Sequence, residues 1–183
     1  MLYNITILLI KLVACTFIVF SIHSQEIEKQ DRQPKEEILT LEPKKINADL
    51  SLIVPPSGFE ISQLFNGYIY PQGSASIIMT LVEGVNYIKV CEGMNESFFT
   101  QNKLTLISDE KFISNNKIKG HKYKFSFKIN EVDFIREMVF AGDLTKTLWL
   151  NITYPKRLTE IMEDEMLKSI MSITLNPLKN EDK

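Results

Sequence analysis

The sequence predicts an α+β fold in which helices cover an antiparallel β-sheet. Four strand-like runs separated by turns follow one another between residues 103 and 154. One predicted helix comes before this block, and an amphipathic helix comes after it. Strands that are grouped in the chain, instead of alternating one by one with helices, are typical of antiparallel neighbours. The 183 residues suffice for one domain with a core of its own.

The first part of this domain is predicted to be β-structure. Residues 48–54, "ADLSLIV", alternate apolar and polar side chains, and the strand ends at Pro55-Pro56 because proline has no N–H for the sheet ladder. Asn66-Gly67 predicts a tight turn between "ISQLF" and "YIY". A second turn, "PQGS" at 71–74, precedes the apolar strand "ASIIMTLV" at 75–82.

A helix is then predicted over residues 86–102. One apolar stripe at helical spacing supports it, made of Tyr87, Cys91, Met94 and Phe98. Gly93 weakens this helix, because glycine in a helix interior is unfavourable.

Four strands are predicted next. They are the runs "KLTLIS", "KYKFSFKI", "VDFIREMVFA" and "KTLWLNITY". The second run alternates aromatic or aliphatic residues with lysine and serine, which indicates one buried and one charged face. Asn130-Glu131 and Gly142-Asp143 mark tight connections between neighbours. Trp149 and Tyr154 have opposite parity in the last strand, so helices on both faces would place both rings in the core.

The C-terminal helix is predicted to begin after Pro155. Its inner stripe consists of Leu158, Ile161, Met162, Met166, Ile170 and Ile173. Its outer face carries Glu160, Glu163, Asp164 and Lys168.

The N-terminal residues are predicted to be an export signal. Lys11 is followed by the apolar run 12–22 and a small polar segment, which is typical of a signal peptide cleaved near Ser24 or Gln25. Two alternatives stay open: an uncleaved membrane anchor, and a lipoprotein acylated at Cys15 in "LVAC". We expect 1–24 to be a signal peptide, 25–46 a charged flexible tether, 47–176 the domain, and 177–183 a disordered tail.

The chemistry open to the mature chain is narrow. His121 is the single histidine and Cys91 the single cysteine that remain after cleavage, so together they form the only conceivable thiol dyad. Cys91 lies on the apolar helical stripe, which favours a buried structural thiol over a nucleophile. His121 follows Gly120 at a turn and is expected to be an exposed loop residue.

Other ligand sites are not indicated. The acidic clusters "SDE" at 108–110 and "EDE" at 163–165 lack the spacing of a calcium loop and are interpreted as solvated faces. Neither a glycine-rich phosphate loop nor a zinc-type cysteine pair occurs, so we expect no metal and no cofactor. The net charge of -2 argues against a nucleic-acid partner.

Over about residues 46–175, several features of the sequence, in their order along the chain, resemble the PsbP-like, or Mog1-like, domains of exported bacterial proteins. They are a Pro-x-x-Gly-Phe corner in "LSLIVPPSGFE", the Ile-x-Gly element in "KIKGHKYKF", the turn "VFAGD", and a strand ending in Tyr-Pro. The resemblance implies an α/β/α sandwich with an antiparallel sheet. It also implies that "VPPSGFE" is a fold corner, in which Gly58 permits the turn and Phe59 fills the core.

The resemblance implies an accessory or binding protein, and no ligand residue is carried over because the ligand residues of such relatives do not map onto this sequence. We therefore expect a non-enzymatic protein that acts on a protein or cell-envelope partner through a sheet edge or a loop cleft, in the periplasm or outside the cell. Membrane contact is expected only through an N-terminal anchor, and the oligomeric state is left open. The alternatives are a carrier of a small apolar ligand and a thiol enzyme that uses Cys91 and His121.

The export hypothesis makes a measurable prediction. Intact mass and Edman sequencing of the exported form should give an N-terminus near Ser24 or Gln25, because the apolar run ends there. An N-terminus at a lipidated Cys15 would instead make the protein a membrane-anchored lipoprotein.

Overall fold

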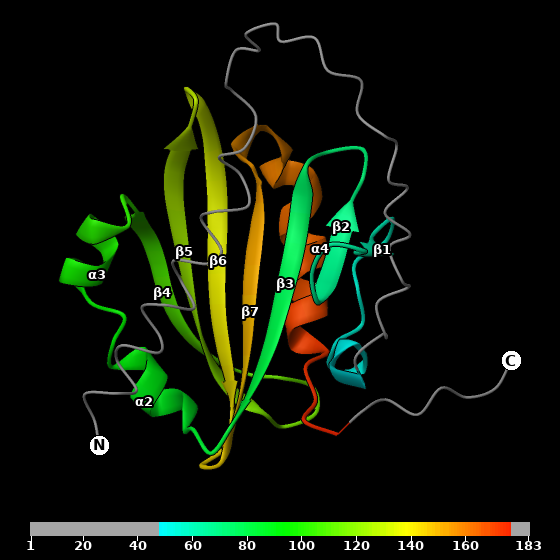
Figure 1. The fold of residues 1–183 in the computed structure, drawn as a ribbon, viewed down its shortest axis with the longest axis vertical. Coiled ribbons are helices and arrows are strands. Elements are labelled where there is room, and N and C mark those ends of the chain that lie inside the picture. Colours follow the sequence, from blue (N-terminus) through cyan, green and yellow to red (C-terminus); the bar gives the residue numbers. More distant parts are fainter. Residues whose placement is uncertain (1–47, 177–183) are drawn as a thin grey trace, which may run out of the picture. The chain divides into compact units, whose positions relative to one another are not determined.

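The structure is a computed structural model that describes residues 48–176 (Figure 1). The predicted signal peptide, tether and tail lie outside the described residues. The elements are η1 (Ala48–Leu52), β1 (Glu60–Ile61), β2 (Gly67–Tyr70), β3 (Ala75–Glu83), α2 (Tyr87–Cys91), α3 (Glu96–Gln101), β4 (Thr105–Ile113), β5 (Lys119–Ile129), β6 (Val132–Gly142), β7 (Lys146–Pro155), η2 (Lys156–Leu158) and α4 (Thr159–Met171).

The strands form one seven-stranded sheet in the order β1-β2-β3-β7-β6-β5-β4. Every neighbouring pair is antiparallel. The predicted sequence of antiparallel neighbours is therefore confirmed from β4 to β7, and β3 closes onto the other side of β7 (Figure 1). This arrangement leaves β7 in the middle of the sheet and β4 at one edge.

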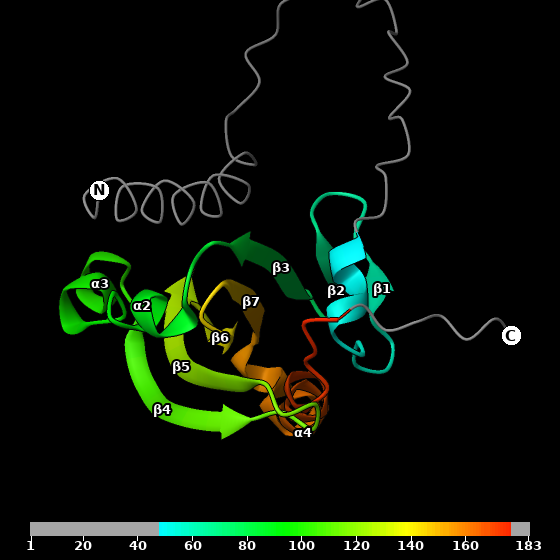
Figure 2. The ribbon, with the colours of Figure 1, turned by 90° about the horizontal axis from the view of Figure 1, so that it is seen from below.

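Helices cover both faces of the sheet, which confirms the predicted α+β fold. Figure 2 shows α4 on one side of the sheet and α2 and α3 on the other. The α4 face forms a continuous apolar core with η1 and with side chains of β3, β6 and β7. On the opposite face, Phe99 of α3 packs on Phe125 of β5, with ring centroids 5.0 Å apart.

The two faces follow from the two-residue period of the strands. In β7, Tyr154 belongs to the α4 core and is fully buried, whereas Trp149 points to the other face beside Phe140 and is 8% exposed. Both rings therefore lie in the core on opposite faces, as predicted.

The tight turn predicted at Asn130-Glu131 joins the two longest strands, β5 and β6. Both turn residues adopt left-handed φ angles, 45° and 65°, as expected for a two-residue hairpin loop that matches the twist of the strands. The register is regular from Ile129 opposite Val132 up to Lys119 opposite Gly142. This hairpin connects the central strand β7, which pairs with β6, to the edge strand β4, which pairs with β5.

The prediction of a strand at 48–54 is wrong, because this segment begins with the 3₁₀ helix η1. Leu50 and Ile53 are buried three residues apart, a spacing that places them on one face of a 3₁₀ turn. The backbone bonds of the segment go to distant partners: the Tyr68 hydroxyl donates to the Leu50 carbonyl at 2.8 Å, and the Thr174 N–H donates to the Leu52 carbonyl at 2.9 Å.

The prediction of a single helix at 86–102 is also wrong, because α2 and α3 are separate short helices. Gly93 lies in the break between them. The Asn95 side chain accepts a hydrogen bond from the Phe98 N–H at 3.1 Å and so caps the start of α3. Asn86 caps α2 in the same way, through the Ile88 N–H at 2.9 Å. Asparagine favours such caps over helix interiors, which explains the second start.

The C-terminal helix α4 is confirmed, with one member of its inner stripe corrected. Met162, Met166 and Ile170 are buried at four-residue spacing against the sheet. Ile161 is 64% exposed, because it is displaced by one residue from that row. Glu163 of α4 pairs with Lys124 on β5 at 2.5 Å, and Lys168 pairs with Glu165 along the helix at 2.5 Å.

The corner at "VPPSGFE" has the predicted turn, but the ring of Phe59 is less deeply buried than predicted. Gly58 has a left-handed φ of 78°, which glycine adopts without steric cost, and the Phe59 N–H donates to the Pro56 carbonyl at 3.2 Å. Phe59 is only half-buried: it packs against the margin of the core and stacks on Tyr70 at 5.4 Å.

The partial burial of the Phe59 ring determines how much stability we expect Phe59→Ala to remove. A fully buried phenylalanine costs roughly 3–5 kcal/mol when truncated to alanine, so the half-buried ring should cost about 1–3 kcal/mol of unfolding free energy. Thermal and chemical denaturation measure this loss. Leu64→Ala is the matched control, since Leu64 is 79% exposed and should change stability by less than about 0.5 kcal/mol. Equal melting of the two variants would contradict a structural role for Phe59.

Candidate functional site

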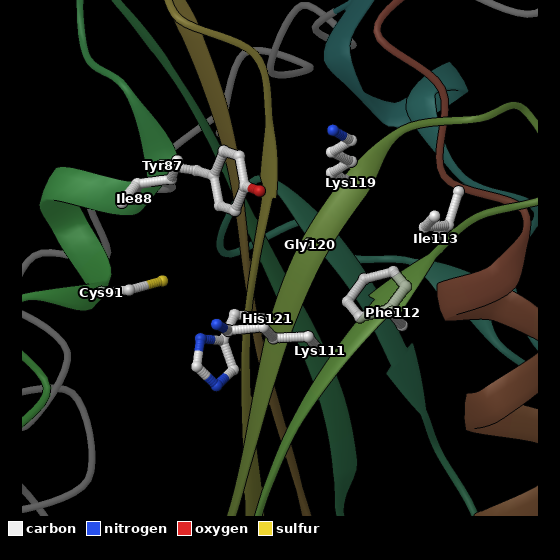
Figure 3. Close-up of a pocket in the computed structure, with 9 residues that line it drawn as sticks. All are labelled: Tyr87, Ile88, Cys91, Lys111, Phe112, Ile113, Lys119, Gly120 and His121. Carbon is white, nitrogen blue, oxygen red and sulfur yellow. The ribbon is translucent and has the colours of Figure 1, made fainter.

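A cavity of about 320 Å³ lies between α2 and the strands β4 and β5 (Figure 3). We call it the α2 pocket. Its lining residues are Tyr87, Ile88 and Cys91 from α2, Lys111, Phe112 and Ile113 from β4, and Lys119, Gly120 and His121 from β5. The volume is at the small end of the range of roughly 300–1,000 Å³ that is typical of ligand pockets.

The β4–β5 register brings the strand residues of the pocket together. Lys111 lies opposite His121, and Ile113 lies opposite Lys119. Because directly opposed residues of antiparallel strands point to the same face, these four side chains share the face that α2 covers. On α2, Tyr87 and Cys91 are four residues apart and therefore also share one face (Figure 3).

Gly120 shapes the sheet beside the pocket. A Cβ atom at this position would lie 2.4 Å from Cζ of Phe112, so the phenylalanine ring occupies the space that a side chain would need. The glycine thus lets Phe112 cross over β5 and pack against the core. The strand β5 begins at Lys119, three residues before the strand predicted from Lys122.

His121 is not the exposed loop residue that was predicted. It lies within β5, and its side chain is 13% exposed. One ring nitrogen is bonded to the carboxylate of Asp109 on β4, and the ring stacks on Tyr123 with centroids 4.3 Å apart. The other ring nitrogen lies 3.3 Å from the Tyr123 hydroxyl. His121 is therefore held on both sides by its neighbours in the sheet.

The structure brings Cys91 and His121 to the same pocket, as the thiol hypothesis required, but it does not activate the thiol. Cys91 is half-buried, and this burial raises the pKa of its thiol to about 11. The Tyr123 hydrogen bond and the charge of Lys111 act in the opposite direction and are outweighed. Since a thiolate forms only above the pKa, Cys91 is neutral near pH 7, whereas a nucleophilic cysteine needs a lowered pKa.

Tyr123 stands between the two candidate residues. Its hydroxyl contacts His121 and hydrogen-bonds the Cys91 thiol, and burial raises the pKa of this hydroxyl. Asp109 and Tyr123 engage the two nitrogens of His121, so Tyr123, and not the Cys91 thiol, is the direct partner of the second nitrogen. The arrangement is suited to holding the pocket wall in place.

The acidic clusters have structural partners. Asp109 binds His121, and Glu110 pairs with Lys122 at 3.5 Å. Of the second cluster, Glu165 accepts from the Ser57 N–H at 3.5 Å in addition to its ion pair on α4. Among residues 48–176, no group of three or more histidine, cysteine, aspartate or glutamate side chains could hold a metal ion.

Two lysines of the pocket were not predicted as site residues. Lys111 and Lys119 are both exposed and belong to ordinary charged runs in the sequence. Their shared face follows only from the β4–β5 register, which the sequence does not specify because a bulge between Leu106 and Ser108 shifts it. Lys119 is the middle residue of the Ile-x-Gly element in "KIKGHK", and this was the signal available in the sequence.

No protein-family profile matches this chain, and none of the curated proteins matches it by sequence. Among solved structures, LpqN of Mycobacterium tuberculosis, which is involved in cell envelope biogenesis, matches 64% of this chain and 78% of its own, with a TM-score of 0.46 and 13% identity. PA94 of Pseudomonas aeruginosa, a protein of unknown function, matches 57% of this chain and 74% of its own, with a TM-score of 0.45 and 10% identity. Both similarities are distant, so the fold is defined by the strand order of the chain itself.

Within the part of the chain that the structure describes, no helix has the length and apolar character needed to cross a membrane.

The raised pKa of Cys91 predicts slow alkylation at neutral pH. In a chain carrying Cys15→Ser, the iodoacetamide rate should still be rising at pH 10, because half of the thiol ionises only near pH 11. A second chain that carries Cys15→Ser, Cys91→Ser and Glu92→Cys provides the exposed thiol for comparison, which should reach its plateau about two pH units lower. A plateau for Cys91 below pH 9 would show an activated thiol and would favour the enzyme hypothesis.

Proposed function

We propose that this chain is an exported, non-enzymatic accessory protein that binds a component of the cell envelope in the α2 pocket. The observation that carries the proposal is the pocket itself, which has a mostly apolar lining and a neutral thiol. Such a site offers a place for the apolar part of a ligand, and no activated nucleophile among its described residues.

The apolar side chains of the pocket favour binding. Ile88 on α2 is 49% exposed and Ile113 on β4 is 56% exposed, and both line the cavity. Covering apolar surface is favourable by roughly 25 cal/mol per Å². A ligand seated between α2 and the strands would remove these side chains from water without any rearrangement of the core.

The state of the candidate dyad supports a non-enzymatic role. Cys91 is protonated near neutral pH, and His121 is engaged by Asp109 and Tyr123. Acyl or group transfer through a cysteine requires a thiolate that is paired with a free base. Binding requires neither.

The proposed relationship to PsbP-like and Mog1-like domains rests on features found in sequence and now located in the fold. The Pro-x-x-Gly-Phe corner makes a turn at Gly58, and Gly120 of the Ile-x-Gly element lies at the start of the long β5–β6 hairpin. Export is supported by the apolar run 12–22 and the polar segment that follows it.

A protein partner is a second candidate, favoured by the edge strand β4. This strand pairs with β5 on one side only, and it is nine residues long. Its outer backbone groups could pair with an extended segment of another protein. Leu106 and Ile107, which are 42% and 51% exposed on the strand, would be covered in such a complex.

The pocket proposal predicts binding of a neutral apolar fluorophore, N-phenyl-1-naphthylamine. Its fluorescence should rise on addition of the protein, and Ile88→Ser combined with Ile113→Ser should weaken binding about 30-fold, because each exchange removes apolar contact worth roughly 1 kcal/mol. Fluorescence titration measures the two dissociation constants.

Two control variants sharpen this experiment. Leu144→Ser changes a residue that is 76% exposed in the β6–β7 connection and should leave binding unchanged. Cys91→Ser should bind the fluorophore nearly as the parent chain does. Binding that is insensitive to the Ile88 and Ile113 exchanges would place the fluorophore elsewhere and would refute the α2 pocket as the site.

A further inference from the structure

We propose that the ligand of the α2 pocket is an amphiphile with an anionic head, whose apolar chain enters the cavity while Lys111 and Lys119 bind the head. This inference rests on the proposed binding function and names its ligand class. It follows from the charges at the pocket and not from its shape alone.

The charged side chains in the mostly apolar lining of the pocket are both lysines. Among the nine lining residues there are two lysines and a histidine, and no aspartate or glutamate. On the face of β4 and β5 that lines the pocket, the acid nearest to Lys111 in the register is Asp109, whose carboxylate is hydrogen-bonded to His121. Lys111 and Lys119 are in none of the ion pairs between described residues.

Charged neighbours on α2, β4 and β5 are already paired, and Asp143, which follows the residue opposite Lys119 on β6, accepts hydrogen bonds from the N–H groups of Thr145 and Lys146. On α2, Lys89 binds Glu92 at 2.9 Å, and across β4 and β5, Glu110 binds Lys122 at 3.5 Å. The pocket thus keeps two ammonium groups for which the adjacent elements supply no partner. Lysine ammonium groups bind carboxylate and phosphate groups as point charges.

The position of the lysines fits a head at the mouth of the pocket. Both are exposed, so their ammonium groups remain in water, while the aliphatic stems line the cavity. Figure 3 shows Lys111 of β4 with its ammonium group beside His121, and Lys119 of β5 beyond the ring of Tyr87. An apolar chain would lie against Tyr87, Ile88 and Ile113, and its anionic end would reach the lysines.

The test compares ligands that share one chain length and differ in the head. Isothermal titration calorimetry with octanoate, octyl phosphate, octanol and octyltrimethylammonium should give the tightest binding for the anions. We expect a preference of about tenfold over octanol, because hydrogen bonds between charged groups are stronger than neutral ones and are weakened by screening at an exposed site. The stronger of the two anions identifies whether the head is a carboxylate or a phosphate.

The paired variant assigns the preference to the two lysines. Lys111→Gln combined with Lys119→Gln should abolish the preference for the anions while octanol binds as before. Lys156→Gln, an exposed lysine just after β7, is the matched control and should keep the preference. Melting temperatures of all variants should agree, because the exchanged lysines make no ion pair among the described residues.

Each result has a distinct meaning. Equal binding of octanoate, octyl phosphate and octanol would overturn the anionic ligand and leave the apolar pocket standing. An anion preference that persists in the paired variant would overturn the assignment to Lys111 and Lys119. Failure of all four ligands to bind would overturn both this inference and the proposed function.

Discussion

The burial of the central strand β7 on both of its faces is the constraint on which the rest of the structure depends. Leu148, Leu150 and Ile152 are fully buried on the α4 face, and Trp149 is buried on the other. A strand that exposes apolar side chains on two faces is stable only when each face is covered. The chain therefore has to return α4 to one side of the sheet and to place α2 and α3 on the other, which creates the pocket beside α2.

The α4 face also has to accommodate a charged group. Glu137 of β6 is 3% exposed, and its carboxylate accepts a hydrogen bond from the Tyr154 hydroxyl at 3.0 Å. Burial raises the pKa of Glu137, and Lys122 and Lys124 on the adjacent strand oppose this effect. Lys124 in turn pairs with Glu163 and so connects β5 to α4. This polar group is therefore satisfied inside the interface, where an unpaired one would be costly.

The elements that could be predicted are those whose pattern of apolar residues is compatible with only one type of secondary structure. The alternation in β5 and the four-residue row Met162, Met166 and Ile170 of α4 each fit a single type of element. Residues 48–54 were misassigned because Leu50 and Ile53 fit a 3₁₀ turn as well as a strand, and the deciding partners, Tyr68 and Thr174, are distant in sequence. The break between α2 and α3 had a local signal, since Asn95 is a favourable cap.

Only part of the site could be predicted. The sequence shows which residue types are present, but it does not show which neighbours surround each of them. Cys91 and His121 were named as the sole candidate pair, yet the β4–β5 register decides that His121 meets Asp109 and Tyr123 instead of an open thiol. The same register aligns Lys111 and Lys119 along the cavity. Burial that keeps the thiol neutral removes reactivity, while the exposed ammonium groups retain attraction for an anion. These properties of the pocket are the ones on which the proposed binding function rests.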